Sequence, residues 1–336
     1  MTRTQLALRA GIASVALTAL GLVAAAPAAA HTNNMYTFIS FGTEVDDGFA
    51  TIGKTDGVAM PLPTPTGIGY EIRGIEVASE KGVAIGYNEN TAVFEWNHTT
   101  GEIGPAIAVY LPSEDYDFGG FSGLDTLNDG RTVTILEFDT EDASDQVWIA
   151  TVNPGTSELI PVADISDVIV VDGIYVYEYD SLATDPATGI TYVFIQNDAS
   201  NEPFYLVVDV AAGTHGEPTL FQGDGFEDGE FRGADFDADG SLYFIYANND
   251  SLIYELSKLG APATWATAER QFISSAPAQY ESIELGSLAL TIEHTVLAAT
   301  GSELPIAAFV ILGTFAVLAG GVTVTVARRR SEAGTV

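Results

Sequence analysis

The chain has 336 residues, and its 12 lysine and arginine residues face 46 aspartate and glutamate residues, which gives a formal net charge of −34 at pH 7. This balance argues against nucleic acids and anionic lipid headgroups as partners, because both are bound by basic surfaces. The absence of cysteine excludes disulfides, thiol chemistry and zinc sites built on cysteine.

The first 30 residues have the pattern of a secretory signal peptide. Arg3 and Arg9 form a basic start, an alanine-rich apolar stretch follows, and the small residues Ala28 and Ala30 fit a cleavage site directly after Ala30. The alternative is an N-terminal membrane helix, for which the apolar stretch is short. The sequence therefore predicts that residues 1–30 are removed when the protein is secreted.

Residues 31–292 contain a repeated pattern: a large apolar residue, any residue, glycine or serine, an apolar residue and usually an acidic residue. The five copies are IRGIEV (72–77), FSGLDT (121–126), YDSLAT (179–184), FRGADF (231–236) and YESIEL (280–285). A turn containing glycine and then further short alternating strands follow each of the first four copies, with no helical period between them. Such a repeat predicts a ring or array of similar β-sheets.

The fifth copy of the repeat is split between the two ends of this region. Its first strand near Thr291 has no strands after it, whereas the strands MYTFISF, FATIGKTDG and VAMPLP at residues 35–63 have no first strand before them. Joining the two parts closes a ring, which protects the sheet edges. We therefore predict an all-β, five-bladed β-propeller closed by N- and C-terminal strands, with the small residue of each copy on a crowded innermost strand. A pair of β-sandwiches is the alternative.

Four copies carry an acidic residue at the position that we treat as equivalent, and the third copy has Ala183 there. The four acidic residues are Glu76, Asp125, Asp235 and Glu284. If the innermost strands direct them to the axis, the carboxylates converge, and they then require a cation or raised pKa values. A hard cation such as Ca²⁺ suits oxygen ligands. In the alternative, each carboxylate accepts hydrogen bonds from a neighbouring turn or pairs with Arg73 or Arg232.

The loops between blades, and those between the second and third strands of a blade, are expected to open on one face of the propeller. They are rich in carboxylates and aromatic rings, and such groups bind sugars, peptides or Ca²⁺. The candidate residues of this ligand-binding face are Asp115, Tyr116, Tyr175, Tyr177, Phe226 and Asp228. The alternative is that these are solvated loops whose rings pack between the blades.

The C-terminal end has the layout of a membrane anchor. Residues 304–327 are uncharged and apolar, and they are long enough to cross a bilayer, which takes about 20 residues. Arg328, Arg329 and Arg330 begin a basic tail over residues 328–336 and are expected to stay in the cytoplasm. The sequence therefore predicts one transmembrane helix, preceded by a tether over residues 293–303, with the bulk of the chain outside the cell.

The tether contains the motif Leu297, Ala298, Ala299, Thr300 and Gly301. Together with the apolar span and the arginines, this motif resembles the sorting signals of Gram-positive surface proteins, whose usual form is L-P-x-T-G. It is similar to the L-A-x-T-G variant associated with class E sortases of high-GC actinobacteria. The resemblance implies that a membrane transpeptidase cuts the Thr300–Gly301 bond and links Thr300 to a peptidoglycan amine. The alternative is a plain single-span membrane protein.

The sequence contains no G-x-S-x-G, H-E-x-x-H or P-loop motif. The stretch DFDADG (235–240) begins like an EF-hand loop, but Tyr246 stands where that loop requires glutamate. We therefore expect a non-enzymatic surface protein, anchored to the wall or plasma membrane of a Gram-positive bacterium, whose acidic propeller binds a carbohydrate, a protein or a cation. The alternatives are a wall-associated hydrolase of glycosidase or lactonase type that uses carboxylates with Ca²⁺, and a purely structural spacer.

Overall fold

The computed structural model describes residues 35–40, 48–63, 71–77, 81–88, 90–109, 116–140, 143–153, 156, 158–171, 174–226, 229–248, 253–275 and 282–290. The predicted signal peptide, the sorting motif and the predicted transmembrane helix lie outside these residues. Within them, no helix is long and apolar enough to cross a membrane.

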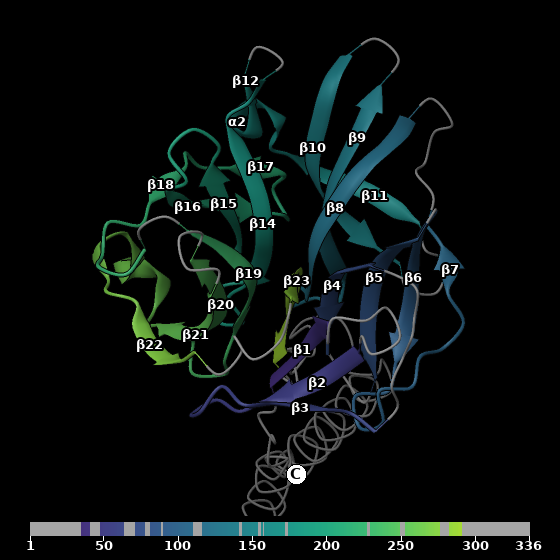
Figure 1. Cartoon of the computed structure of the whole chain (residues 1–336). Coiled ribbons are helices and arrows are strands. Elements are labelled where there is room, and N and C mark those ends of the chain that lie inside the picture. The colour runs from purple at the N-terminus through teal and green to yellow at the C-terminus, as the bar shows by residue number, and fades with distance from the viewer. Residues whose placement is uncertain are drawn as a thin grey trace, which may run out of the picture. The chain divides into compact units, whose positions relative to one another are not determined.

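Strand pairing divides the described residues into five antiparallel sheets, which we call the first to fifth blades (Figure 1). The first blade consists of β4 (Glu71–Glu76), β5 (Gly82–Asn88), β6 (Asn90–Trp96) and β7 (Ile107–Ala108). The second consists of β8 (Tyr116–Thr126), β9 (Thr132–Thr140), β10 (Ala143–Val152) and β11 (Leu159–Asp164). The third consists of β14 (Tyr177–Thr184), β15 (Thr191–Asn197), β16 (Pro203–Asp209) and β17 (Thr214–His215), and β18 (Thr219–Leu220) also pairs with β16.

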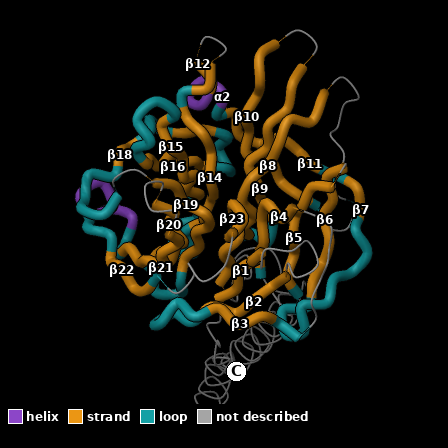
Figure 2. Tube along the Cα trace, viewed as in Figure 1, coloured by secondary structure: helices purple, strands orange, loops and turns teal. Residues whose placement is uncertain are grey.

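The fourth blade consists of β19 (Gly229–Phe236), β20 (Leu242–Asn248), β21 (Ile253–Leu259) and β22 (Gln271–Ser274). The fifth consists of β23 (Ser282–Leu290), β1 (Met35–Ser40), β2 (Gly48–Ile52) and β3 (Ala59–Pro61). A small hairpin of β12 (Val170–Val171) and β13 (Ile174–Tyr175) lies between the second and third blades. Helix in the described part is limited to α2 (Ser166–Ile169) and the 3₁₀ helix η1 (Pro262–Thr267), so strands predominate (Figure 2).

The ring closes where the sequence predicts. β23 is the innermost strand of the fifth blade and pairs antiparallel with β1, so a C-terminal strand completes a sheet begun by N-terminal strands. The innermost strands contact one another in a closed circle, in the order β4, β8, β14, β19, β23 and back to β4. The prediction of an all-β, five-bladed propeller is therefore confirmed.

The small residues of the first two copies, Gly74 and Gly123, lie where neighbouring innermost strands approach closely. A Cβ atom built on Gly74 of β4 would lie 2.8 Å from the carbonyl carbon of Gly123 on β8. Gly123 has a φ of +68°, and a Cβ atom built on it would lie 2.9 Å from the backbone nitrogen of Leu182 on β14. Side chains larger than a hydrogen atom at these two positions would force the strands apart, as expected for a crowded axis.

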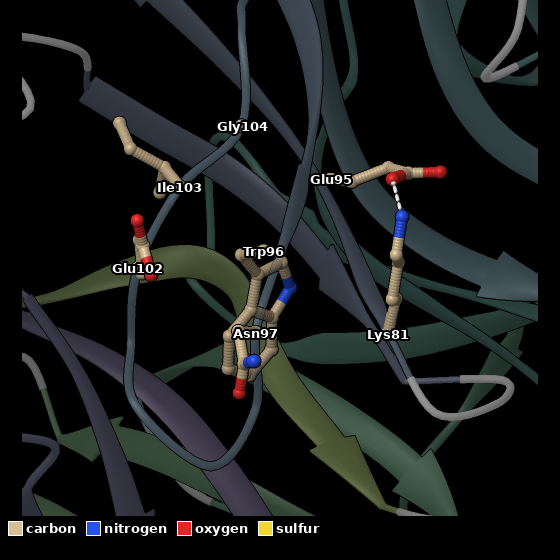
Figure 3. Close-up of a pocket in the computed structure, with 7 residues that line it drawn as sticks. All are labelled: Lys81, Glu95, Trp96, Asn97, Glu102, Ile103 and Gly104. Atoms are coloured by element: carbon tan, nitrogen blue, oxygen red, sulfur yellow. Dashed lines mark hydrogen bonds and ion pairs between the residues drawn. The ribbon is translucent and has the colours of Figure 1, made fainter.

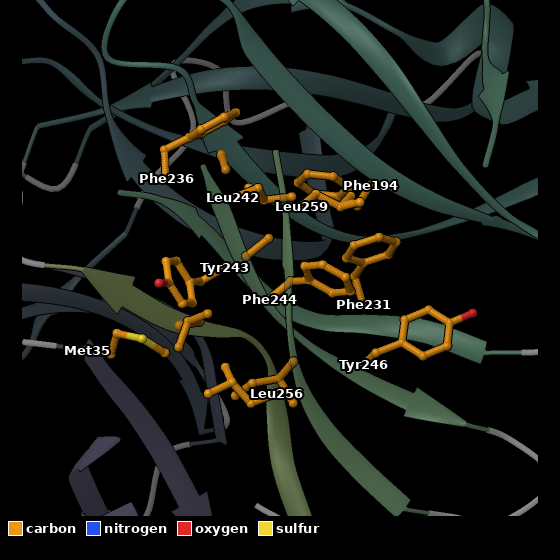
Figure 4. Packing of buried hydrophobic residues seen from close by; sticks show 14 of the residues in the cluster. Met35, Phe194, Phe231, Phe236, Leu242, Tyr243, Phe244, Tyr246, Leu256 and Leu259 are labelled. Carbon is orange, nitrogen blue, oxygen red and sulfur yellow. The ribbon is translucent and has the colours of Figure 1, made fainter. Parts of the chain in front are cut away.

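The hydrophobic core lies between the blades. Because both faces of a blade pack against neighbours, a central strand is buried on both sides, and residues 191–196 of β15 are all buried, with apolar or aromatic side chains at 192–195. Figure 4 shows one such cluster, in which Phe194 of β15 stacks on Phe231 of β19 with ring centroids 4.5 Å apart. Trp265 of η1 is fully buried and stacks on Phe236, so this short helix covers the cluster from the rim of the fourth blade.

Candidate functional site

Three of the predicted acidic residues meet near the axis, at the ends of their innermost strands. Glu76 lies at the end of β4, Asp125 near the end of β8 and Asp235 near the end of β19. Their exposed fractions are only 2%, 2% and 5%. The charges of Asp125 and Asp235 raise the pKa of Glu76, and the charge of Asp125 raises the pKa of Asp235, so the three lie within electrostatic reach of one another. We call Glu76, Asp125 and Asp235 the axial carboxylates.

The strand register places alanine at the two remaining positions of this ring. Ala183 occupies the position on β14, as the repeat indicated. On β23 the pairs Tyr36↔Ala289 and Met35↔Leu290 place Ala289 at the equivalent position, so the equivalence that we assigned to Glu284 is five residues out of register. The side chain of Glu284 lies outside the described part.

The sequence contained a signal for the correct alignment of β23. ELGSLAL at 284–290 matches EYDSLAT at 178–184 along its length, whereas YESIEL matches only the small-residue pattern. In the correct alignment, Glu284 corresponds to Glu71, Glu178 and Glu230, near the starts of the innermost strands. The pattern of one small residue between apolar neighbours occurs twice within β23, and pairing with β1 selects the second occurrence.

The two axial aspartates join adjacent blades through backbone hydrogen bonds. Oδ1 of Asp125 accepts the N–H of Thr126 at 2.6 Å, and Oδ2 accepts the N–H of Thr184 in the third blade. Oδ1 of Asp235 accepts the N–H of Phe236 at 2.7 Å, and Oδ2 accepts the N–H of Leu290 in the fifth blade at 2.5 Å. Each aspartate therefore holds the end of its own strand to the innermost strand of the next blade.

The two arginines considered as partners of the axial carboxylates are engaged elsewhere. Arg73 pairs with Glu71, and Arg232 pairs with Glu230, in each case on the same strand. The axial aspartates therefore accept hydrogen bonds from the backbone, as one alternative from the sequence predicted. They do not pair with Arg73 or Arg232, as the other alternative predicted.

Burial raises the pKa values of all three axial carboxylates, and repulsion between the carboxylates adds to the shifts of Glu76 and Asp235. For Glu76, burial places the pKa well above its usual range, and the charges of Asp125 and Asp235 add to this effect. Burial raises the pKa of Asp125 to about 7, against the hydrogen bonds from Thr126 and Thr184, which lower it. Burial and then the charge of Asp125 raise the pKa of Asp235 well above its usual range. Protons therefore neutralise part of this charge at neutral pH.

In the described part of the chain, no group of three or more histidine, aspartate or glutamate side chains is arranged to hold a metal ion. The axial carboxylates are included in that statement, and most of their oxygens already accept backbone hydrogen bonds. The Ca²⁺ prediction therefore receives no support from these residues, and it stays a prediction for the acidic loops.

A second group of charges, which the sequence analysis did not identify, lies near the starts of β14 and β19. Asp180 is only 1% exposed, and its Oδ2 accepts the N–H of Phe231 at 3.2 Å. Burial raises its pKa well above the usual range, and the charge of Glu230 adds to this. Burial also raises the pKa of Glu230, while Arg232 opposes the change, and Glu178 nearby is exposed. We call Glu178, Asp180, Glu230 and Arg232 the mouth cluster.

The repeat contains the pattern that would have revealed this cluster. A glutamate followed two residues later by a charged residue occurs at the start of three innermost strands: Glu71 and Arg73, Glu178 and Asp180, and Glu230 and Arg232. On β4 and β19 the second residue is an arginine that pairs with the glutamate. β14 carries aspartate instead, so its two carboxylates have no cation on their own strand.

The aromatic residues predicted for the ligand-binding face differ in their accessibility. Phe226 is only 3% exposed and stacks on Phe221 with ring centroids 4.6 Å apart, so it belongs to the core and its assignment to this face is wrong. Tyr175 and Tyr177 are half-buried against the apolar cluster of the second and third blades. Tyr177 contacts Phe204 edge-on at 5.2 Å. Asp115, Asp228 and the side chain of Tyr116 lie outside the described part.

A shallow pocket lies on the outer half of the first blade (Figure 3). It is lined by Lys81, Glu95, Trp96, Asn97, Glu102, Ile103 and Gly104. Lys81 and Glu95 form an ion pair at its side. Trp96 is 1% exposed and stacks on Phe49 at 4.0 Å, so it offers no ring face to a ligand. The pocket has a volume of about 200 Å³, which is below the range of typical small-molecule sites.

No protein-family model and no curated protein matches the chain. Similar solved structures include the periplasmic gluconolactonase PpgL of Pseudomonas aeruginosa, with 11% identity, 71% of this chain and 81% of that chain covered, and a TM-score of 0.38. The GH43_1 enzyme from Xanthomonas citri complexed with xylose has 11% identity and a TM-score of 0.38, with 60% of this chain and 72% of that chain covered. The Dos1 propeller has 10% identity and a TM-score of 0.34, with 68% of this chain but only 54% of that chain covered. At these values the similarities carry no argument about function, and the fold assignment rests on strand pairing.

Proposed function

We propose that the protein is a secreted surface protein, anchored at its C-terminal end to the wall or membrane of a Gram-positive cell, and that its propeller binds an extracellular ligand without catalysing a reaction. The observation that carries this proposal is the use of the two axial aspartates as blade-to-blade connectors. Both carboxylate oxygens of each aspartate accept a backbone N–H group. Carboxylates so engaged stabilise a ring and are poorly placed to attack a substrate.

The ligand surface that we favour is the end of the ring where the innermost strands begin. The mouth cluster lies there, and half-buried Tyr177 precedes Glu178 on β14. The exposed carboxylate of Glu178 beside this aromatic ring suits hydroxyl groups of a carbohydrate or the cationic side chains of a protein. Ca²⁺ bound by the acidic loops that the sequence predicts for the ligand-binding face, with Asp115 and Asp228 among their residues, would act as a bridge to such a ligand.

The alternative is a wall-associated hydrolase of glycosidase or lactonase type. One observation favours it: Asp180 and Glu230 are neighbouring carboxyl groups whose pKa values are both raised, mainly by burial. A carboxyl group that stays protonated near neutral pH can act as a general acid. In this alternative, Glu230 donates the proton because it is the more exposed of the two.

A binding screen separates these functions. Full-length protein is tested against glycans and metal ions with and without EDTA, together with Glu178→Gln and the control Glu217→Gln, which changes an exposed carboxylate of the third blade. We expect Glu178→Gln to weaken binding at least tenfold and Glu217→Gln to leave it unchanged. Release of reducing sugar or opening of a lactone by the wild type, abolished by Glu230→Gln, would instead establish the hydrolase.

The anchor is tested on protein recovered from cells. We propose that the Thr300–Gly301 bond is cut and that Thr300 carries a wall fragment. Mass spectrometry should find the mature C-terminus at Thr300, and Thr300→Ala should retain residues 301–336. An intact tail on the wild-type protein in cells with an active sortase would refute processing and leave the single-span alternative.

A further inference from the structure

The hairpin of β12 and β13 has an apolar outer face at the end of the ring where β14 begins (Figure 1). In this hairpin Val170 pairs with Tyr175, and Val171 pairs with Ile174. Because successive side chains of a strand point to opposite faces, the two pairs lie on opposite faces of the hairpin. Val170 and Tyr175 pack on the apolar cluster of the second and third blades, whereas Val171 and Ile174 are 46% and 67% exposed. The solvated face of an antiparallel pair is ordinarily polar, so two large aliphatic side chains here suit contact with a partner.

The base of the hairpin is fixed to the ring by hydrogen bonds. Val176, directly after β13, donates its N–H to the carbonyl oxygen of Ile169 at 2.9 Å, and its own carbonyl oxygen accepts the N–H of Asp198 at 3.0 Å. Ile169 belongs to α2 and is fully buried. Ser166, at the start of α2, accepts the N–H of Val147 on β10 through its Oγ at 2.9 Å. A surface held in place in this way loses less entropy when a partner binds.

The strands around the hairpin, from β9 to β18, belong to a strongly acidic part of the chain. Residues 132–231 contain 20 aspartate and glutamate residues and no lysine or arginine. Asp167 of α2, Glu178 of β14 and Asp198 after β15 are exposed and adjoin the base of the hairpin. The histidine of this stretch, His215, pairs with Asp167 through its Nε2 at 3.0 Å. The apolar pair is therefore surrounded by negative charge, which repels acidic surfaces and attracts cationic ones.

This combination of apolar and acidic groups narrows the choice of partner. A second copy of the chain has the same negative charge, so two facing hairpins would bring like charges together. Anionic lipid headgroups are repelled for the same reason. Burial of two aliphatic side chains requires apolar surface on the partner, and the buried centre of a protein interface supplies such surface.

We propose that Val171 and Ile174 dock into an apolar cleft of a partner protein, and that lysine and arginine residues at the rim of this cleft contact the carboxylates around the hairpin. This inference rests on the proposed function, extracellular binding beside the mouth cluster, and names a basic protein surface as the ligand. The two aliphatic side chains anchor the complex, and the carboxylates orient the partner and speed its association. Salt should therefore weaken the charged contribution and leave the apolar one.

The probe for this surface is a short synthetic peptide that alternates lysine and leucine. Its binding to the full-length protein is measured by fluorescence anisotropy at physiological salt, beside a lysine–serine peptide and a glutamate–leucine peptide. We expect the lysine–leucine peptide to bind at least tenfold more tightly than either control peptide, because only this peptide supplies both charge and apolar surface. Equal affinity for the lysine–leucine and lysine–serine peptides would show that charge alone is read and would overturn the inference.

Substitutions in the hairpin locate the binding surface. The double variant Val171→Ser and Ile174→Ser should weaken binding of the lysine–leucine peptide at least tenfold and leave binding of the lysine–serine peptide unchanged. Met60→Ser is the matched control, because Met60 is 63% exposed on β3 of the fifth blade and should affect neither peptide. All three substituted side chains are exposed, so urea unfolding should have the same midpoint in the variants as in the wild type.

Three results would overturn the inference. The first is equal binding of the lysine–leucine peptide by the wild type and the double variant. The second is dimerisation, or binding to vesicles of phosphatidylcholine, that the double variant abolishes, since it would identify a second copy or a membrane as the occupant. The third is glycan or metal binding that depends on Glu178 while no peptide binds, which would leave the proposed function intact. Hydrolysis abolished by Glu230→Gln would instead refute the proposed function, whatever the peptides show.

Discussion

Replacing Gly74 with alanine tests how tightly the innermost strands pack at the axis. The new Cβ atom would lie 2.8 Å and 2.9 Å from the carbonyl carbon and oxygen of Gly123, and 2.9 Å from the Cβ atom of Leu124. Two of these atoms are backbone, so no side-chain rotation relieves the contact and β4 must move away from β8. Overpacking of this kind costs about 1–3 kcal/mol, from which the reduced entropy of the unfolded chain returns about 0.4–1 kcal/mol. We expect a net loss of about 1–2 kcal/mol.

Alanine variants of three other glycines distinguish the effect of crowding from the effect of backbone strain. Gly260 has no atom within 4 Å of a built Cβ and no positive φ, so its alanine variant should be neutral or slightly stabilised. Gly240 is equally open but has a φ of +78°, so its variant should lose about 1 kcal/mol through strain alone. Gly123 combines a φ of +68° with a Cβ contact of 2.9 Å, so its variant should lose the most.

The assay is equilibrium urea unfolding followed by tryptophan fluorescence, because Trp96 and Trp265 are both buried in the folded ring. The expected order of stability is Gly260→Ala, then Gly240→Ala and Gly74→Ala, and last Gly123→Ala. If the free energy of unfolding of Gly74→Ala lies within about 0.5 kcal/mol of that of Gly260→Ala, the strands separate without cost and the crowding argument is wrong.

Other predictions concern the core, one ion pair and the ring closure. Trp265→Ala should cost about 3–5 kcal/mol in urea unfolding, whereas Phe272→Ala, at a side chain that is 54% exposed, should change stability by about 0.5 kcal/mol or less; equal losses would contradict the role of η1 in the core. Lys54→Met removes the partner of Asp237 and should lower the thermal midpoint of unfolding. Adding Asp237→Asn to the same chain should recover part of that loss. Additive losses in this double-mutant cycle would show that the ion pair contributes nothing to stability. Deleting residues 31–40 removes β1 and exposes the edge of β23, so size-exclusion chromatography should show association, and a monodisperse monomer would argue against closure by this strand.

Local sequence patterns were sufficient to predict the number of blades and the division of the fifth blade between the two ends of the propeller. Each repeat is encoded by neighbouring residues, and the orphan strands at residues 35–63 could be matched to a C-terminal strand by counting. The register that we assigned to that strand from the repeat was wrong. Two serines of β23, Ser282 and Ser287, fit the small-residue pattern, and the pairing of Met35 with Leu290 selects the second.

The candidate site was only partly predictable for a similar reason. Glu76, Asp125 and Asp235 were identified because the repeat aligns them. Asp180 is as deeply buried but was not identified, because the repeat aligns it with Arg73 and Arg232 and does not show that Glu230, on another blade, lies beside it. Phe226 was assigned to a binding face on its loop composition, but the aromatic cluster around it shows that it packs in the core.

The sequence by itself determined the class of fold, the number of blades and the small residues of the first four repeats, because these depend on patterns within one strand or one repeat. It also carries the signal peptide and sorting motif, which stay predictions because they lie outside the described residues. The tertiary structure decided which carboxylates meet, which hydrogen bonds they accept and in which direction their pKa values shift. Those properties depend on side chains from different blades, and only the closed ring sets the distances and the burial that govern their charge.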